Sequence, residues 1–462
     1  MKRLATIMLI PLLLPVISFG ISMEESVSDV VKTHPEVRKR VENYRATVED
    51  RTIARAEYLP VIDAQTGIGY KDYNGPNTLF TDDTYKTSES FVRLRQNLFQ
   101  GFGSLHNIRR QDARLDSAQY YLMESVSNIG LDIVEAHLEV LKRQKLLQLA
   151  RENLENHKRI YAMIKERTDS GAGPVSDFEQ SSGRLALANS NMKVEINNYE
   201  DALATYERLS GEPAVIADMA EPNLTGSTLP ENIDLAIEQA LQNHPSALVS
   251  QKNIAAAKEA YSQSSETLYP WVDLEAKKEW ERGWEHDSSA FDQDRDEFSI
   301  MLIASWNLYN GGADMAAKAQ ALSEVFSNTE SLLDIKRALK EQLQLSWAAK
   351  IRLTQQMDYL EMHRDFSRKT VESYNEEFRV GRRTLLDLLD VEIEFYTARK
   401  EYEAARYDQI FAEYRIVENT GGLPQLLNIK IDEMIALQRH ESNGSEEQTE
   451  QPVQNDTNET GN

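Results

Sequence analysis

The chain has 462 residues, 41% of them hydrophobic and 27% charged, with a formal net charge of −24. This excess of acidic side chains argues against a nucleic-acid partner, because binding to phosphates requires Lys and Arg in excess. The absence of cysteine excludes disulfide bonds, thiol catalysis and lipoprotein acylation. The eight histidines lie far apart in the sequence, so we expect no metal site, no cofactor and no enzymatic activity.

Residues 1–20 are predicted to be a secretory signal peptide. Lys2 and Arg3 precede an apolar stretch at 4–17, and Ser18-Phe19-Gly20 fits a small-x-small cleavage site. The alternative is an N-terminal membrane anchor, but a spanning helix needs about 20 apolar residues. This stretch is shorter and is interrupted by two prolines. The mature chain is therefore either soluble outside the cytoplasm or spans a membrane as β-strands.

The rest of the chain contains one unit written twice, at a constant offset of 210 residues. His34-Pro35 recurs as His244-Pro245, and Gly171 recurs as Gly381. Because this period is far longer than that of solenoid repeats, we predict a duplicated unit of domain size. The predicted parts are a first unit at 21–213, a connecting segment at 214–233, a second unit at 234–424 and a C-terminal segment at 425–462. The acidic tail from about 441 has no Lys or Arg and is predicted to be disordered.

Near the start of each unit, two segments alternate between apolar and polar side chains, which is the period of a β-strand. In the first segment, for example, the apolar residues Ile62, Ile68 and Tyr70 occupy even positions, whereas the charged residues Asp63 and Lys71 occupy odd positions. The four predicted strands lie near 61–71, 89–100, 271–281 and 297–309. One apolar face, one charged face and aromatic residues near the ends are typical of transmembrane strands. A half-exposed soluble sheet remains the alternative.

Long, charge-rich stretches without proline follow the strands of each unit. Their sparse apolar stripes predict helices that pack as coiled coils. The predicted helices cover 104–170, 174–210, 313–380 and 383–420. The longest would measure about 100 Å at 1.5 Å per residue, which no compact globular domain accommodates.

Four strands are too few to close a transmembrane barrel. An open strand edge in lipid leaves backbone N–H and C=O groups unpaired, at a high cost in free energy. We therefore expect the chain to oligomerise if these strands lie in a membrane.

Together these features resemble the TolC family of outer-membrane channel proteins. The resemblance is carried by the duplicated unit, by Tyr58-Leu59-Pro60 before the first strand, and by the segments that leave the hairpins, QNLFQGFG at 96–103 and WNLYNGG at 306–312. It implies a mainly α fold with a transmembrane β part, in which three chains contribute four strands each to a 12-stranded barrel continued by a periplasmic helical tunnel. It also implies a homotrimer in contact with outer-membrane lipid of a Gram-negative cell, a periplasmic adaptor and an inner-membrane transporter of the ABC type.

Within this family the sequence is more similar to the type I secretion components. The lack of cysteine excludes the acylated N-terminus of the lipidated drug-efflux ducts, and the phrase Asn-Leu-Phe-x-Gly-Phe-Gly fits the secretion branch. The resemblance therefore implies a passive exit duct for type I protein secretion, with efflux of drugs or other small molecules as the alternative. A soluble periplasmic coiled-coil scaffold, a function of another class, would account for the helices but not for the four strands.

The two helix reversals are the candidate docking tips for the adaptor and the transporter. Glycine permits a chain to reverse at the end of a helix, and proline suits the first turn of the next one. A tight turn alone would also explain these glycines. The candidate tip residues are Gly171, Gly173, Pro174, Gly381, Arg382 and Thr384.

Charged residues beside the second reversal are the candidate channel constriction. Asp387 and Asp390 are three residues apart and so share one helix face; around a trimer axis they would form a ring of six carboxylates that attracts cations. The resemblance matches this pair to aspartates at the periplasmic entrance, Arg383 to an arginine that latches the closed state, and Asp177 to an aspartate that links neighbouring coils. Phe378 stands where the best-known member has a tyrosine, so it offers no hydroxyl for a latch. The plainer alternative is a solvated helix face with an Arg383–Asp387 ion pair.

Overall fold

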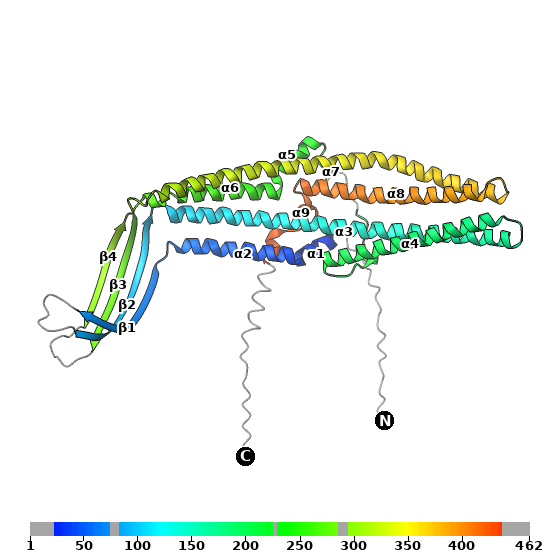
Figure 1. Cartoon of the computed structure of the whole chain (residues 1–462). Helices are drawn as coiled ribbons and strands as arrows, with labels where there is room; N and C mark the ends of the chain where they lie inside the picture. Colours follow the sequence, from blue (N-terminus) through cyan, green and yellow to red (C-terminus); the bar gives the residue numbers. More distant parts are fainter. Residues whose placement is uncertain (1–22, 74–82, 223, 225–228, 285–293, 437–462) are drawn as a thin grey trace, which may run out of the picture.

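The structure is a computed structural model that describes residues 23–73, 83–222, 224, 229–284 and 294–436. The predicted signal peptide and the predicted disordered tail lie outside these residues. The molecule is elongated, with a β-sheet at one end and two helical hairpins reaching the other (Figure 1). Within the described residues, every helix is too short or too polar to cross a membrane.

The sheet has four antiparallel strands in the order β1-β2-β3-β4, as predicted. They are β1 (Val61–Tyr73), β2 (Asp83–Gln100), β3 (Trp271–Trp284) and β4 (Arg295–Ser305). The pairing of β2 with β3 joins the two halves of the chain. In the described part of the chain, β1 pairs only with β2 and β4 only with β3, so each outer strand keeps one unpaired edge.

The fourth strand ends earlier than the sequence predicts, at Ser305 rather than near 309. The side-chain oxygen of Asn307 accepts a hydrogen bond from the backbone N–H of Tyr309, 3.2 Å away. Such a local bond favours a turn, in which the backbone no longer pairs with a neighbouring strand. Gly311 and Gly312 follow with φ angles of 60° and 87°, which redirects the chain into the next helix.

The register places apolar side chains mainly on one face of the sheet and charged side chains mainly on the other, although Lys278 lies on the apolar face and Met301 and Ile303 on the charged one. One row joins Ile62, Leu94, Ala276 and Ile300, and the next row, on the opposite face, joins Asp63, Arg93, Lys277 and Ser299. In the second row the guanidinium of Arg93 lies 2.9 Å from the carboxylate of Asp63. The sheet therefore has the amphipathic character that a lipid-facing sheet requires.

Nine α-helices complete the described part of the chain. They are α1 (Met23–Thr33), α2 (Pro35–Ala56), α3 (Gly103–Asp169), α4 (Val175–Ser210), α5 (Ile233–Asn243), α6 (Pro245–Gln263), α7 (Ala313–Arg379), α8 (Leu385–Asn419) and α9 (Leu423–Leu426). Two short 3-10 turns lie at Ile216–Asp218 and Glu266–Leu268. Helices α3 and α7 have 67 residues each, about 100 Å at 1.5 Å per residue. The expected fold of long helices with four strands is confirmed.

The two His-Pro pairs begin helices α2 and α6. The Nδ1 atoms of His34 and His244 accept hydrogen bonds from the backbone N–H of Glu36 and Ser246, each 3.2 Å away. The prolines that follow occupy the first helical turn, where a missing N–H costs nothing. The repeated dipeptide is therefore a helix start in each half of the chain.

The main hydrophobic core lies midway along the helices. It joins α1 and α2 to the middle of α3, the ends of α4 and α8, and α9. Tyr414 is fully buried there, and its hydroxyl donates a hydrogen bond to Glu24, 2.9 Å away. Leu427 packs closely against Gly130, and a Cβ at this glycine would lie only 2.9 Å from the leucine side chain. This core holds α1, α2 and α9 against the middle of α3 and the ends of α4 and α8.

Candidate functional site

The two helical hairpins reverse direction by the same backbone geometry. At the end of α7, Gly381 adopts a φ of 75°, its N–H bonds to the carbonyl of Phe378, and the N–H of Arg382 bonds to the carbonyl of Glu377. At the end of α3, Gly171 has a φ of 73° and makes the corresponding bond, 2.9 Å long, to Thr168. This pattern is the Schellman motif, which favours glycine. It accounts for both glycines as structural residues.

The helices that leave the two reversals begin differently. Thr384 caps α8: its hydroxyl accepts a bond from the N–H of Asp387, and the Asp387 carboxylate accepts bonds from the N–H and the hydroxyl of Thr384. These bonds lower the pKa of Asp387 below its ordinary value. At α4 the cap position is Pro174, which makes no side-chain bond, and Asp177 lies in the first turn. Pro174 thus precedes α4, whereas the sequence predicted that it would begin the helix. Gly173 beside it packs near Arg167.

A small hydrophobic cluster closes the tip of the two hairpins. Phe378 is buried in it, and the guanidinium of Arg167 lies 5.5 Å from the Phe378 ring centre. The other buried members are Ile160, Ile164, Leu385, Leu388 and Leu389. Phe378, a candidate gating residue, is therefore part of the packing that holds α3, α7 and α8 together.

The charged candidates have partners that their sequence spacing does not indicate. The Nε of Arg383 donates to Glu377, 2.7 Å away, and its guanidinium lies 4.1 Å from the ring centre of Tyr374. The bond to Glu377 raises the pKa of Arg383. Asp390 lies 2.9 Å from Arg184 of α4. The alternative ion pair of Arg383 with Asp387 is thus replaced by a pair with Glu377.

Arg184, Glu377 and Tyr374 are therefore tip residues that the sequence reasoning missed. Arg184 is 206 residues from Asp390, and only the packed hairpins bring them together. A short-range signal existed for Glu377 alone, because a helix reversal brings the residues on its two sides together.

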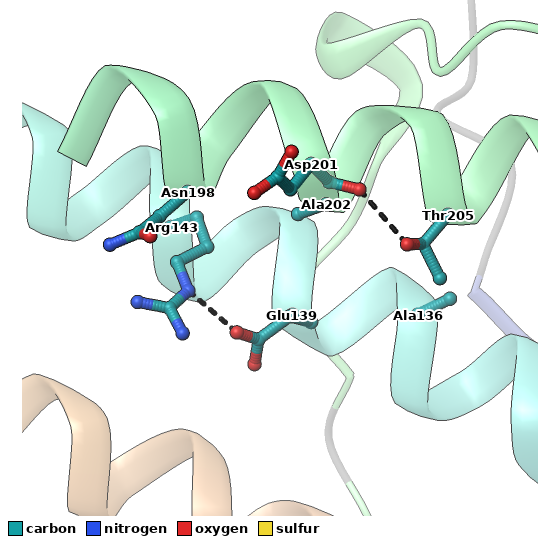
Figure 2. A pocket seen from close by; sticks show the side chains of 7 residues that line it. All are labelled: Ala136, Glu139, Arg143, Asn198, Asp201, Ala202 and Thr205. Atoms are coloured by element: carbon teal, nitrogen blue, oxygen red, sulfur yellow. Dashed lines mark hydrogen bonds and ion pairs between the residues drawn. The ribbon is translucent and has the colours of Figure 1, made fainter. Parts of the chain in front are cut away.

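A polar groove opens between α3 and α4 near the middle of α3. Figure 2 shows Glu139 and Arg143 from α3 facing Asn198 and Asp201 from α4. Its volume is about 240 Å³, and the Nε of Arg143 donates to Glu139, 2.6 Å away. In the part of the chain that the structure describes, no three His, Asp or Glu side chains gather as metal ligands. We assign no ligand to this groove.

A comparison with known protein families matches the two halves of the chain separately. The sequence model of the family "Outer membrane efflux protein" matches residues 27–212 and 236–422. The chain belongs to this family. Similar relatives include the alkaline protease secretion protein AprF of Pseudomonas aeruginosa, 23% identical over 88% of this chain and 86% of the relative. The outer membrane protein TolC of Escherichia coli is 20% identical over 85% of this chain and 80% of the relative.

Among solved structures, the CmeC outer membrane channel of Campylobacter jejuni superimposes with a TM-score of 0.75. It is 13% identical and covers 86% of each chain, which shows the shared fold. The predicted relationship to the TolC family and the predicted outer-membrane location, with a periplasmic helical extension, are confirmed. The family comprises membrane channels, so the chain is a passive channel rather than an enzyme or a soluble scaffold. The unit boundaries and the roles of the tip residues stay predictions.

Proposed function

We propose that three copies of this chain form an exit duct for type I protein secretion. In this proposal a periplasmic adaptor and an ABC-type inner-membrane transporter dock at the tips formed by Gly171, Pro174, Gly381, Arg382 and Thr384. The duct itself is passive, and the transporter supplies the energy.

The observation that carries this proposal is the pair of open edges of the sheet. In lipid, each unpaired backbone N–H or C=O costs several kcal/mol. Strand β1 pairs only with β2 and β4 only with β3 in the described part of the chain. Pairing of β4 with β1 of the next copy removes both edges once the ring closes, and three copies give the 12 strands of the family's architecture.

Helix α7 gives a second reason to expect neighbouring copies. Large apolar side chains follow its length without cover from the rest of the chain: Met315, Leu322, Phe326, Leu333, Leu345, Ile351, Tyr359, Met362 and Phe366. Exposed apolar surface of this extent marks an interface. A helix that lies beside another copy would bury these residues.

The passage would be lined by the polar face of the sheet and, at the far end, by the tips. We place Asp387 and Asp390 at the narrowest point, with Arg383 and Asp177 beside them. The Asp390–Arg184 pair supports a closed arrangement in which α8 lies against α4. Phe378 supports that arrangement by packing in the tip cluster.

One relative and the name of the family bear on the cargo. AprF is a protease secretion protein by name, and a chain similar to it over most of its length is a reasonable protein exporter. The family name itself refers to efflux, which keeps export of small molecules as the second candidate.

The assembly is tested by native mass spectrometry of the detergent-extracted protein, which we expect to give the mass of three chains. The cargo is tested by deleting the gene in the native host. Protein secretion predicts that a large exported protein is lost from the culture medium and returns on complementation. Unchanged secreted proteins, with accumulation of a small toxic compound in the cells, would favour efflux instead.

A further inference from the structure

A buried carboxylate lies where three helices meet, away from the tip. Glu195 of α4 is 2% exposed. Its Oε1 atom lies 2.5 Å from the Nζ of Lys400 of α8. Its Oε2 atom accepts a bond from the amide of Asn198, 3.3 Å away, and faces the guanidinium of Arg143 of α3 at 3.9 Å. Glu195 is thus tied to both neighbouring helices by charge.

In the other ion pairs between α8 and the α3–α4 hairpin, the acidic partner is much more exposed than Glu195. In these pairs the acidic side chains of Asp390, Glu152 and Asp408 are 57%, 42% and 53% exposed. Exposed ion pairs contribute little, whereas removing one partner of a buried pair is costly because it leaves an uncompensated charge. Among these links, loss of the basic partner is therefore most costly at Glu195, because its carboxylate is buried.

Packing between α4 and α8 is loose at this level. A cavity of about 450 Å³ lies between the two helices beside the pair, lined in part by Asn191, Tyr396 and Thr397. The Glu195–Lys400 pair is a direct polar link between α4 and α8 beside this cavity.

The duplicated sequence provides an internal comparison. The residue 210 positions after Glu195 is Ala405 of α8, which is also buried. The second hairpin thus packs its equivalent position with a small apolar side chain. A carboxylate at this place is not a general requirement of the hairpin.

We propose that Glu195 is a positioning residue that, with Lys400, fixes α8 to the α3–α4 hairpin and so stabilises the closed arrangement of the tips. This inference depends on the proposed function as a duct. Towards the tip from this pair, α8 is also held by the exposed Asp390–Arg184 pair, by the bond from Asn156 to the buried Glu392 and by the tip cluster.

The test compares Glu195→Gln and Lys400→Gln with the parent in planar bilayers, using the full-length protein. Glu200→Gln is the matched control, because Glu200 lies on the same helix and is exposed. We expect about a tenfold rise in the ratio of open to closed dwell time for both Glu195→Gln and Lys400→Gln, since either change breaks the ion pair of the buried Glu195 side chain. The control should behave as the parent. Ion selectivity should stay unchanged in all three, because the tip aspartates are untouched.

Several outcomes would overturn the inference. If Glu195→Gln and Lys400→Gln lower the melting temperature but keep the parent's dwell times, the role of the pair is purely structural. If the dwell-time ratio rises equally in the Glu200→Gln control, the effect is nonspecific. If Glu195→Gln does not fold, Lys400→Gln decides, because the Lys400 side chain is partly exposed. A parent protein that inserts but never conducts contradicts the proposed duct, and the inference falls with it.

Discussion

The two roles of Asp387, as a cap partner and as a charge, can be separated by mutation. Thr384→Val keeps the side-chain volume but removes the hydroxyl that donates to the Asp387 carboxylate, 2.8 Å away, and accepts from its N–H at 3.2 Å. Loss of an N-cap of this kind costs about 1 kcal/mol, which is about a fivefold change in a local equilibrium.

Loss of this cap would also weaken the tip cluster. The first turns of α8 contribute Leu385, Leu388 and Leu389 to it, so fraying of α8 exposes the reversal that contains Arg382 and Arg383. We expect trypsin to cleave the Thr384→Val protein there about five times faster than the parent, when opening and closing are fast relative to cleavage. Ion selectivity should not change, because both aspartates remain.

The matched variant is Asp387→Asn combined with Asp390→Asn. It removes the charge but keeps an acceptor oxygen for Thr384, so trypsin cleavage should stay close to that of the parent. Planar-bilayer recordings should show weaker cation preference and weaker block by divalent cations. Because bonds from Thr384 lower the pKa of Asp387 below its ordinary value, its contribution to the cation preference should persist below about pH 4, the ordinary range of Asp.

The reasoning would be refuted by either of two results. If the double Asn variant keeps the parent's selectivity and divalent block, these carboxylates do not line the passage. If Thr384→Val alters selectivity as much as the double variant does, the cap and the charge are not separable roles.

Three further predictions concern stability. Burial lowers the pKa of His137 below 6.5, so the folded state binds a proton at His137 less readily than the unfolded state. The free energy of unfolding should therefore be highest above about pH 6.5 and fall below it. His137→Asn should flatten this pH dependence in urea titrations. Gly211 and Gly421 both have φ near 80°, but only at Gly421 would a Cβ meet a backbone oxygen, that of Asn243 at 2.9 Å, so Gly421→Ala should lower the melting temperature more than Gly211→Ala. Phe378→Ala should destabilise the tip cluster by about 3–5 kcal/mol, seen as faster hydrogen exchange at the ends of α7 and α8 with little change in the sheet.

Much of the fold follows from local periodicity in the sequence. The alternation around Ile62 and Asp63 has the period of a strand, and the long stretches without proline propagate as helices of 67 residues. Both signals are short-range and depend on backbone geometry that each residue shares with its neighbours. The end of β4 was misplaced because the side chain of Asn307 starts a turn that the apolar pattern does not record.

The site was less accessible to sequence reasoning. Spacing places Asp387 and Asp390 on one helix face, but it does not reveal that one caps α8 and the other pairs with Arg184. Those contacts depend on how hairpins far apart in the chain pack together. The Glu195–Lys400 pair, 205 residues apart, is of the same kind. Such pairs look like any solvated charges on helices until the packing is known.

The most direct test of the duct is whether β4 of one copy lies beside β1 of another in the outer membrane. The chain has no cysteine, so Ile68→Cys on β1 can be combined in turn with Phe298→Cys, Ile300→Cys and Leu302→Cys on β4. These side chains are exposed on the outer strands. After treatment of intact outer membranes with a short bismaleimide, the account predicts a covalent species of three chains for at least one pair and none for the single-cysteine proteins. Monomers throughout, or a ladder extending beyond three chains, would contradict a closed ring of three copies.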